Sequence, residues 1–176
     1  VKVSGVPTTS YELPESVKNA TEVGSPMNPD MEIIKSLNPT DVICVDTLGS
    51  DFEKQFEENN INADFYNLSN VDGLKETIAA LGEKFNKQDK ANEILDEIKE
   101  VEDKVNSNKK SDDKILVLFG APGSVMVATD KSYIGNLVEL AGGNNIFSNA
   151  TSSFTQINLE EIIKLNPDKI LVMTHA

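Results

Sequence analysis

Two side chains of this sequence could bind a metal through soft or nitrogen donors. Met27 stands between Pro26 and Asn28-Pro29, so its backbone is stiff, and no helix or strand periodicity requires an apolar residue there. His175 is the sole histidine and follows an apolar run at 171–173. One thioether and one imidazole suit the two axial positions of haem iron, whereas a bare divalent ion requires more and harder ligands. Partial burial of Met27 and a hydrogen-bonded strand end at His175 are the structural alternatives.

The sequence lacks the residue patterns of the common catalytic and nucleotide sites. One histidine and no G-x-S-x-G context exclude a usual hydrolytic triad, and the turn at 120–123 has neither G-x-G-x-x-G nor a P-loop lysine. Cys44 is alone within an apolar strand pattern and is interpreted as a buried side chain. The sequence therefore predicts a binding protein and no enzyme. A small α/β enzyme or an interaction domain is the alternative from a different class.

An internal repeat indicates where these two side chains stand. When Pro39 is laid over Pro167, Glu32 corresponds to Glu160 and an isoleucine corresponds to an isoleucine two residues later. Each copy predicts a short amphipathic helix, an Asn-Pro stop and a buried strand. Two copies suggest two lobes of like construction that bind a ligand between them, with His175 at the carboxyl end of a strand.

The other patterns alternate between strand and helix, which is typical of α/β layers with parallel sheets. Asn28 is expected to cap the first helix, with Pro29 as its first residue. A long amphipathic pattern at 86–106 predicts a connecting helix between lobes. We therefore predict an α/β fold of two Rossmann-like lobes joined by a single backbone helix, both lobes truncated. The expected division is 1–85 for the N-terminal lobe, 86–108 for the backbone helix and 109–176 for the C-terminal lobe.

Charge and composition narrow the classes of partner. The net charge is −13 with a pI near 4.4, which disfavours nucleic acid and anionic membrane surfaces. All sixteen basic residues are lysines, so the bidentate arginine clamp for carboxylates and phosphates is missing. No stretch approaches the ~20 apolar residues of a membrane span.

Two segments resemble a known family. Residues 117–143, which include Gly120-Ala121-Pro122-Gly123, and residues 24–32 around Met27 closely resemble the haem-receptor lipoproteins of the iron-regulated surface determinant (Isd) system. The similarity extends from about Gly5 to His175. That family comprises the substrate-binding components of haem ABC importers, in the class with two lobes joined by one long helix.

The resemblance implies roles for individual residues. It implies that Met27 and His175 are the axial ligands of haem (iron protoporphyrin IX, the transported ligand), and that residues 87–106 form the backbone helix. It also implies that Glu32 and Glu160 are docking points for the ABC permease, although a glutamate favoured by the helix dipole explains them nearly as well. The hydroxyls of residues 8–10 would line the haem propionates: Thr8, Thr9 and Ser10.

The resemblance further implies a monomer on the extracellular face of the cell membrane, lipid-anchored in its full-length form. Cell-surface haem-donor proteins are expected partners in addition to the permease. Family members start earlier and continue past the histidine, which is normally followed by glycine where Ala176 stands here; we therefore expect a fragment. A ferric siderophore receptor of the same architecture is the alternative binding function, and the missing arginines count against it.

Overall fold

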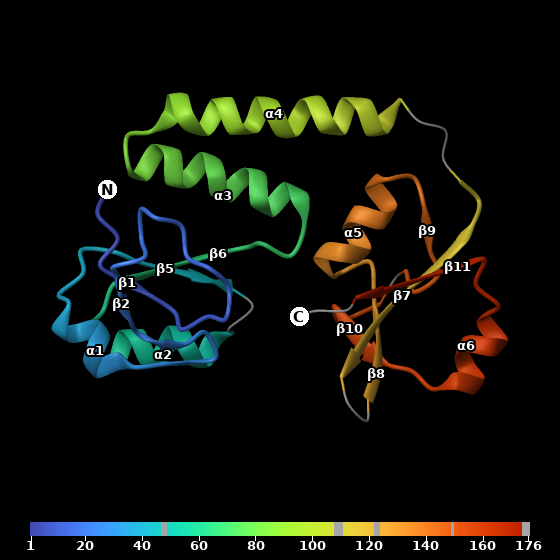
Figure 1. Ribbon diagram of the computed structural model, residues 1–176, viewed down its shortest axis with the longest axis horizontal. Helices are drawn as coiled ribbons and strands as arrows, with labels where there is room; N and C mark the ends of the chain where they lie inside the picture. Colours follow the sequence, from blue (N-terminus) through green and yellow to red (C-terminus); the bar gives the residue numbers. More distant parts are fainter. Residues whose placement is uncertain (47–48, 108–110, 122–123, 149, 174–176) are drawn as a thin grey trace. The chain divides into compact units, whose positions relative to one another are not determined.

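The computed structural model describes residues 1–46, 49–107, 111–121, 124–148 and 150–173. The chain forms two compact units, Val1–Tyr66 and Asn67–Ala176 (Figure 1). Both units are of mixed α/β type, which confirms the predicted fold class. The boundary at Tyr66 assigns the two long helices to the second unit, and the division at 85 and 108 stays a prediction.

Within its described residues, 1–46 and 49–66, the first unit contains three two-stranded sheets and two helices. β1 pairs with β2 and β5 pairs with β6, both in parallel, while β3 and β4 form an antiparallel hairpin. Its core includes Ile34 and Phe56, which are 5% and 3% exposed, and the ring of Phe56 meets that of Phe65 edge to face at 6.1 Å. Its elements are β1 (Gly5–Val6), β2 (Thr21–Glu22), β3 (Gly24–Ser25), β4 (Asn28–Pro29), α1 (Met31–Ser36), β5 (Val42–Val45), α2 (Ser50–Glu58) and β6 (Ala63–Tyr66).

The second unit begins with two helices that run side by side, α3 (Val71–Lys84) and α4 (Gln88–Asn106) (Figure 1). Helix α4 confirms the helix expected at 86–106. The two helices approach closely because Gly82 has no side chain: a Cβ at Gly82 would lie 2.5 Å from the Cβ of Ala91. Lys75 of α3 also forms a 2.9 Å ion pair with Glu102 of α4.

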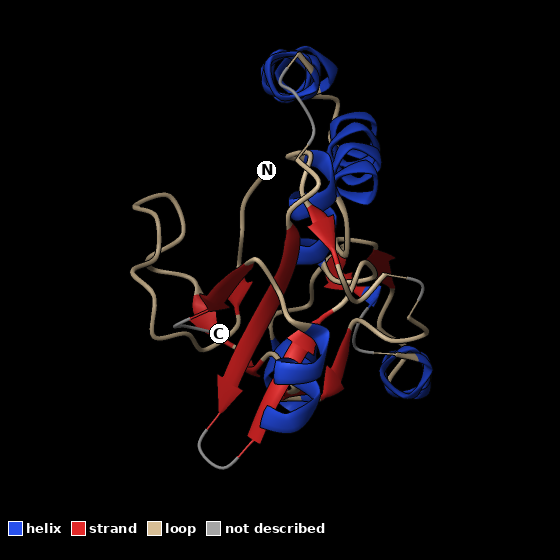
Figure 2. Cartoon of the chain, turned by 90° about the vertical axis from the view of Figure 1, so that its right-hand side faces the viewer, coloured by secondary structure: helices blue, strands red, loops and turns tan. Residues whose placement is uncertain are grey.

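The rest of the second unit is a mixed sheet with the helices α5 (Tyr133–Leu140) and α6 (Leu159–Leu165) packed on it. Its strand order is β10-β8-β7-β11, and β9 also pairs with β7. The central residues Leu116 and Val117 of β7 are fully buried, because α6 covers one face of the sheet and α5 the other. Figure 2 shows α6 in front of the strands. The elements are β7 (Lys114–Ala121), β8 (Ser124–Ala128), α5 (Tyr133–Leu140), β9 (Asn144–Asn145), β10 (Phe154–Gln156), α6 (Leu159–Leu165) and β11 (Lys169–Met173).

The expectation of parallel sheets throughout is wrong for this sheet. Strands β7 and β11 are parallel, but β8 is antiparallel to both β7 and β10. The physical reason is the chain length between β7 and β8: only two residues connect them, whereas a parallel connection needs a crossover of a dozen or more.

The internal repeat predicted from the sequence has a structural counterpart. Helix α1 is followed by β5, and α6 is followed by β11. Asn38 and Asn166, which precede the two aligned prolines, both adopt left-handed backbone with φ of 46° and 47°. The predicted burial of the two strands is wrong in both copies: Ile43 of β5 is 44% exposed, and Ile170 and Val172 of β11 are 47% and 62% exposed. The reason is that each strand lies at an edge of its described sheet.

The predicted cap of the first helix is also wrong. Asn28 and Pro29 belong to β4, and the cap is Asp30, whose carboxylate accepts hydrogen bonds from the backbone N–H groups of Glu32 and Ile33 at 3.0 Å each. Pairing of Pro29 with Gly24 in the hairpin outweighs the preference of proline for a first helical position. Pro29 also has no N–H to lose from the ladder.

Candidate functional site

Met27 lies in the turn of the β3–β4 hairpin. Ser25 pairs with Asn28, which leaves Pro26 and Met27 as the two-residue connection. The side chain of Met27 is 71% exposed. Burial against the core therefore does not explain a methionine at this position, and the thioether is open to a ligand.

The hairpin is fixed at its base by a glycine. Gly24 has φ of +92°, a backbone region that glycine adopts without a steric penalty. A Cβ at Gly24 would lie 2.9 Å from both the carbonyl oxygen of Asn28 and the backbone nitrogen of Asp30. In addition, the N–H of Asp30 donates to the carbonyl of Val23 at 2.8 Å. The backbone that carries Met27 is thus held at both ends.

The hydroxyl-rich loop predicted to contact propionates joins this hairpin directly. The backbone N–H of Thr8 donates to the carbonyl of Gly24 at 2.8 Å, and the Thr8 hydroxyl donates to a carboxylate oxygen of Glu22 at 3.2 Å. The hydroxyl oxygen of Thr9 accepts from the N–H of Tyr11 at 3.1 Å. Thr8, Thr9 and Ser10 are all exposed, so the loop beside the Met27 hairpin presents hydroxyls to solvent.

His175 lies outside the described residues. The structure describes its strand, β11, as far as Met173, which pairs with Phe119 of the parallel strand β7. The carboxyl ends of these two strands therefore meet at one edge of the sheet, where open α/β sheets gather their ligands. The pairing of Met27 with His175 on one iron stays a prediction.

Glu32 and Glu160 occupy equivalent positions in the two copies of the repeat. Each is the second residue of its helix, α1 or α6, and each is exposed. The capping box of α6 uses the neighbouring Glu161: its side chain accepts from the N–H of Asn158 at 3.0 Å, and its N–H donates to the Asn158 side chain at 2.9 Å. Within the described residues, neither Glu32 nor Glu160 has a side-chain hydrogen bond or ion pair.

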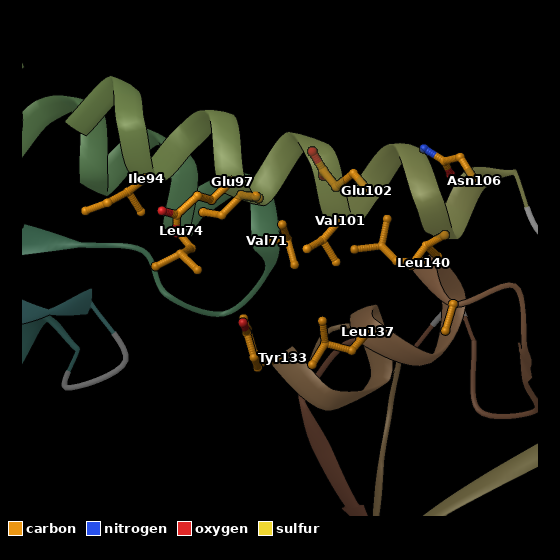
Figure 3. A pocket seen from close by; sticks show the side chains of 13 residues that line it. Val71, Leu74, Ile94, Glu97, Val101, Glu102, Asn106, Tyr133, Leu137 and Leu140 are labelled. Atoms are coloured by element: carbon orange, nitrogen blue, oxygen red, sulfur yellow. The ribbon is translucent and has the colours of Figure 1, made fainter. Parts of the chain in front are cut away.

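A pocket within the second unit was not foreseen from the sequence. It encloses about 540 Å³ between α3, α4 and α5. Figure 3 shows Tyr133 and Leu137 of α5 directed toward α4 across this space. The apolar face of α4 extends beyond the part of the helix that packs on α3. Val101, which lies on this face, is 58% exposed. The lining is mostly aliphatic and comprises Val71, Leu74, Ile94, Glu97, Ile98, Val101, Glu102, Val105, Asn106, Tyr133, Leu137, Leu140 and Ala141.

The described residues hold few other groups for metal chemistry. No group of three or more His, Cys, Asp or Glu side chains is placed to bind a metal within them. Burial, and secondarily the charge of Asp64, raises the pKa of the Cys44 thiol, so this thiol stays protonated and is a poor metal ligand at neutral pH. Nor is any helix of the described part of the chain long and apolar enough to span a membrane.

The family model for periplasmic binding proteins matches residues 1–176. The chain belongs to the periplasmic binding protein family. Its relatives are substrate-binding proteins of ABC importers, which are not enzymes. This agrees with the prediction made from the missing catalytic patterns.

The sequence and the structure of this periplasmic binding protein are similar to those of three proteins. It is 36% identical over 177 residues to the high-affinity heme uptake system protein IsdE of Staphylococcus aureus strain Newman, covering 99% of this chain and 61% of that protein. The structure of S. aureus IsdE complexed with heme matches with a TM-score of 0.89 and 36% identity, covering 100% of this chain and 69% of that one. An ABC transporter substrate-binding protein from Listeria monocytogenes EGD-e matches with a TM-score of 0.85 and 35% identity, covering 96% and 66%.

These matches confirm the resemblance noted in residues 24–32 and 117–143. The chain spans about three fifths of the length of the curated relatives that it matches.

Proposed function

We propose that this periplasmic binding protein is the haem-binding part of an extracellular receptor that delivers haem to an ABC permease for iron acquisition. The observation that carries the proposal is the hairpin of Met27: a thioether that the core does not use, presented to solvent on a backbone fixed by Gly24. The relative named for heme uptake and the relative solved with heme, both 36% identical to this chain, support haem as the ligand.

In this proposal Met27 and His175 supply the two axial ligands of the iron. A thioether and an imidazole together give a six-coordinate iron and favour its reduced state more than two nitrogen ligands do. Thr9 and Ser10 donate hydroxyl hydrogen bonds to the propionates, a task that an arginine would otherwise perform. Thr8 joins them when its hydroxyl releases the carboxylate of Glu22, to which it donates in the free protein. The sequence has no arginine, so hydroxyls suit this role, whereas an anionic siderophore chelate would lack the bidentate arginine clamp.

Glu32 and Glu160 serve as the docking points for the permease. Their support is the equivalence of the two positions and the exposure of both carboxylates, while the capping of α6 falls to Glu161. The proposed receptor acts as a monomer at the outer face of the membrane, held by a lipid anchor in its full-length form. It receives haem from cell-surface donor proteins.

The absorption spectrum of the protein mixed with haemin tests the ligand assignment. The unmodified protein should give a low-spin Soret spectrum, and Met27→Leu and His175→Ala should each convert it to a five-coordinate or high-spin form with weaker binding. Met31→Leu is the matched control, because Met31 is a part-buried residue of α1 and its replacement should leave the spectrum unchanged. Identical spectra for the protein, Met27→Leu and His175→Ala would overturn the assignment.

Docking is tested separately from haem binding. In the double variant Glu32→Ala, Glu160→Ala the haem spectrum should remain that of the unmodified protein, while haem-dependent growth of cells that carry the importer should fall. The double variant Glu57→Ala, Glu58→Ala removes the same charge from exposed positions and should not affect growth. Equal growth with both double variants would remove the two glutamates from the proposal.

A further inference from the structure

The four methionines of the chain differ in how far solvent reaches their side chains. Met27 is 71% exposed. Met31, Met126 and Met173 are each partly buried. Met173 packs against the cluster that includes Val138 of α5, and Met126 lies in β8 between the paired strands β7 and β10. An oxidant in solution must touch a sulfur atom to oxidise it, so it reaches the thioether of Met27 first.

The thiol of Cys44 does not compete with this thioether. Cys44 is partly buried, and burial, with a smaller contribution from the charge of Asp64, raises the pKa of its thiol. The thiol therefore stays protonated at neutral pH, whereas the thiolate is the form that reacts with oxidants. Among the sulfur atoms of the chain, that of Met27 is the most accessible.

The exposure of Met27 is fixed by the backbone of its hairpin. The ring of Pro26 locks the φ angle of the preceding turn residue, and Gly24 at the base has φ of +92°. The N–H of Asp30 donates to the carbonyl of Val23 at 2.8 Å and closes the base of the hairpin. Moving residue 27 toward the core would break this pairing, so the sulfur stays at the surface.

The surroundings of Met27 tolerate a polar sulfur. Its neighbours Ser25, Pro26 and Asn28 are exposed, so an oxygen atom added to the Met27 sulfur would face water. A sulfoxide at Met173 would instead place a polar group against the apolar cluster beneath α5, which disrupts packing. Oxidation at Met27 therefore changes the chemistry of one sulfur atom and leaves the fold intact.

We propose that Met27 is a site of reversible oxidation by hydroperoxides. A lone pair of the Met27 sulfur attacks one oxygen of hydrogen peroxide, and an S–O bond forms as the O–O bond breaks. The other oxygen takes the proton of the transferred oxygen and leaves as water, so the sulfur is oxidised by two electrons and the peroxide is reduced by two. A methionine sulfoxide reductase with a dithiol as reductant restores the thioether, with a disulfide and water as the other products.

The consequence for iron rests on the proposed haem function. A thioether is a soft donor that suits an axial position of haem iron, whereas a sulfoxide carries a hard oxygen. The protein oxidised at Met27 should therefore behave toward haemin as Met27→Leu does. Peroxide then lowers haem uptake until the sulfur is reduced again, which makes the hairpin a redox-sensitive switch.

The oxidation step is measured without haem. The protein is treated with dilute hydrogen peroxide, the peroxide is removed with catalase, and sulfoxide at each methionine is followed by peptide mass spectrometry. Sulfoxide should form several-fold faster at Met27 than at any other methionine, and methionine sulfoxide reductases for both epimers should remove it. The thermal midpoint should not change when Met27 alone is oxidised. Equal rates at all four methionines would overturn the modification site.

Haemin added after the catalase step tests the switch. The treated protein should lose its low-spin Soret spectrum in proportion to the sulfoxide at Met27, and should regain it after reduction. The spectrum of Met27→Leu should be the same before and after peroxide, while Met31→Leu, the matched control, should respond as the unmodified protein does. An unchanged spectrum in protein fully oxidised at Met27 would overturn the switch.

Failure of this inference differs from failure of the function on which it rests. If the untreated protein never gives the low-spin spectrum, the haem function fails and the switch fails with it, whatever the mass spectra show. If the untreated protein gives that spectrum but peroxide oxidises Met27 no faster than the other methionines, the axial ligation stands and the oxidation proposal is overturned.

Discussion

The two copies of the helix–strand repeat share a sequence pattern but differ in what surrounds them. In α1–β5 the helix buries Ile34 in the core of the first unit and its strand pairs with β6. In α6–β11 no helix residue is buried. The two strands do not differ in this way, because Ile43 of β5 is 44% exposed and Ile170 of β11 is 47% exposed. The local conformation is therefore determined by the repeated sequence itself, whereas the burial of the helix depends on the elements packed around it. Four predictions test this separation.

The largest difference is expected for the aligned isoleucines. Ile34→Ala should lower the free energy of unfolding by about 2–5 kcal/mol, because Ile34 is 5% exposed and its removal leaves a cavity. Ile162→Ala, at the equivalent position in part-buried surroundings, should cost less. Urea denaturation followed by circular dichroism measures both. Equal losses would show that the two copies are buried alike.

The caps come next. Asp30→Ala removes two hydrogen bonds from backbone N–H groups of α1, and Asn158→Ala removes the one hydrogen bond of the α6 capping box that the Asn158 side chain accepts. Each should cost about 1 kcal/mol of unfolding free energy, within a usual range of about 0.5–2 kcal/mol. Asp30→Asn and Asn158→Asp exchange the two cap types and should restore most of each loss. A cost in one copy alone would contradict the local nature of the cap.

The left-handed asparagines should behave alike in the two copies. Asn38→Ala and Asn166→Ala each remove the short polar side chain that makes asparagine tolerant of left-handed backbone, here with φ of 46° and 47°, at a cost of about 1 kcal/mol of unfolding free energy. Asn38→Gly and Asn166→Gly should be close to neutral, because glycine accepts this conformation. Thermal unfolding of the four variants measures this, and unequal costs for the two alanine variants would break the equivalence.

The smallest effect belongs to the second copy alone. Lys169 of β11 hydrogen-bonds to Asp113 and, together with the Ser111 hydroxyl, holds the pKa of the Asp113 carboxyl below its ordinary value. A lowered carboxyl pKa stabilises the fold above the ordinary value of about 3.9 and loses that contribution as the pH falls through the lowered value. The pKa of Lys169 is raised by the same hydrogen bond, so its contribution is present below about pH 10.4 and is lost as the pH rises through the raised value.

The difference in urea midpoint between the protein and Asp113→Asn should therefore be small and constant near neutral pH, and should shrink below about pH 4. Both groups are at the surface, so added salt should reduce it as well. A difference that grows as the pH falls would contradict the assignment. Within the described residues, β5 of the first copy carries no ion pair that corresponds to Lys169–Asp113. The stability of the first copy should therefore lack this dependence on pH and salt.

Local sequence patterns predicted the elements better than their partners. The spacing of apolar residues predicted α4 nearly in full. Ser132 caps α5, as is usual for serine, and its hydroxyl accepts from the N–H of Gly135 at 3.0 Å. Periodicity did not reveal that β8 returns antiparallel, because strand direction depends on a two-residue connection and not on side-chain pattern. Nor did it place Asn28 and Pro29 in a strand, since their pairing partner Gly24 precedes them across a turn.

The candidate site was predicted in part. The isolation of Met27 between prolines identified an exposed thioether, and the hydroxyl loop of Thr8 proved to be bonded to the same hairpin. The aromatic contact of Phe119 with Phe154 could not be predicted, because the two residues meet only through the register of three strands. Alternation of side chains along the adjacent strands could have indicated that the two residues lie on the same face of the sheet.

In the proposed receptor, the glycine at the base of the Met27 hairpin would influence the iron from a distance. Any larger residue at position 24 would push against the backbone at positions 28 and 30 and so tilt the turn that carries the sulfur. If Met27 ligates the iron as proposed, natural variation at position 24 would therefore adjust the reach of the sulfur, and with it the colour and redox behaviour of the haem, without altering any atom that touches the iron.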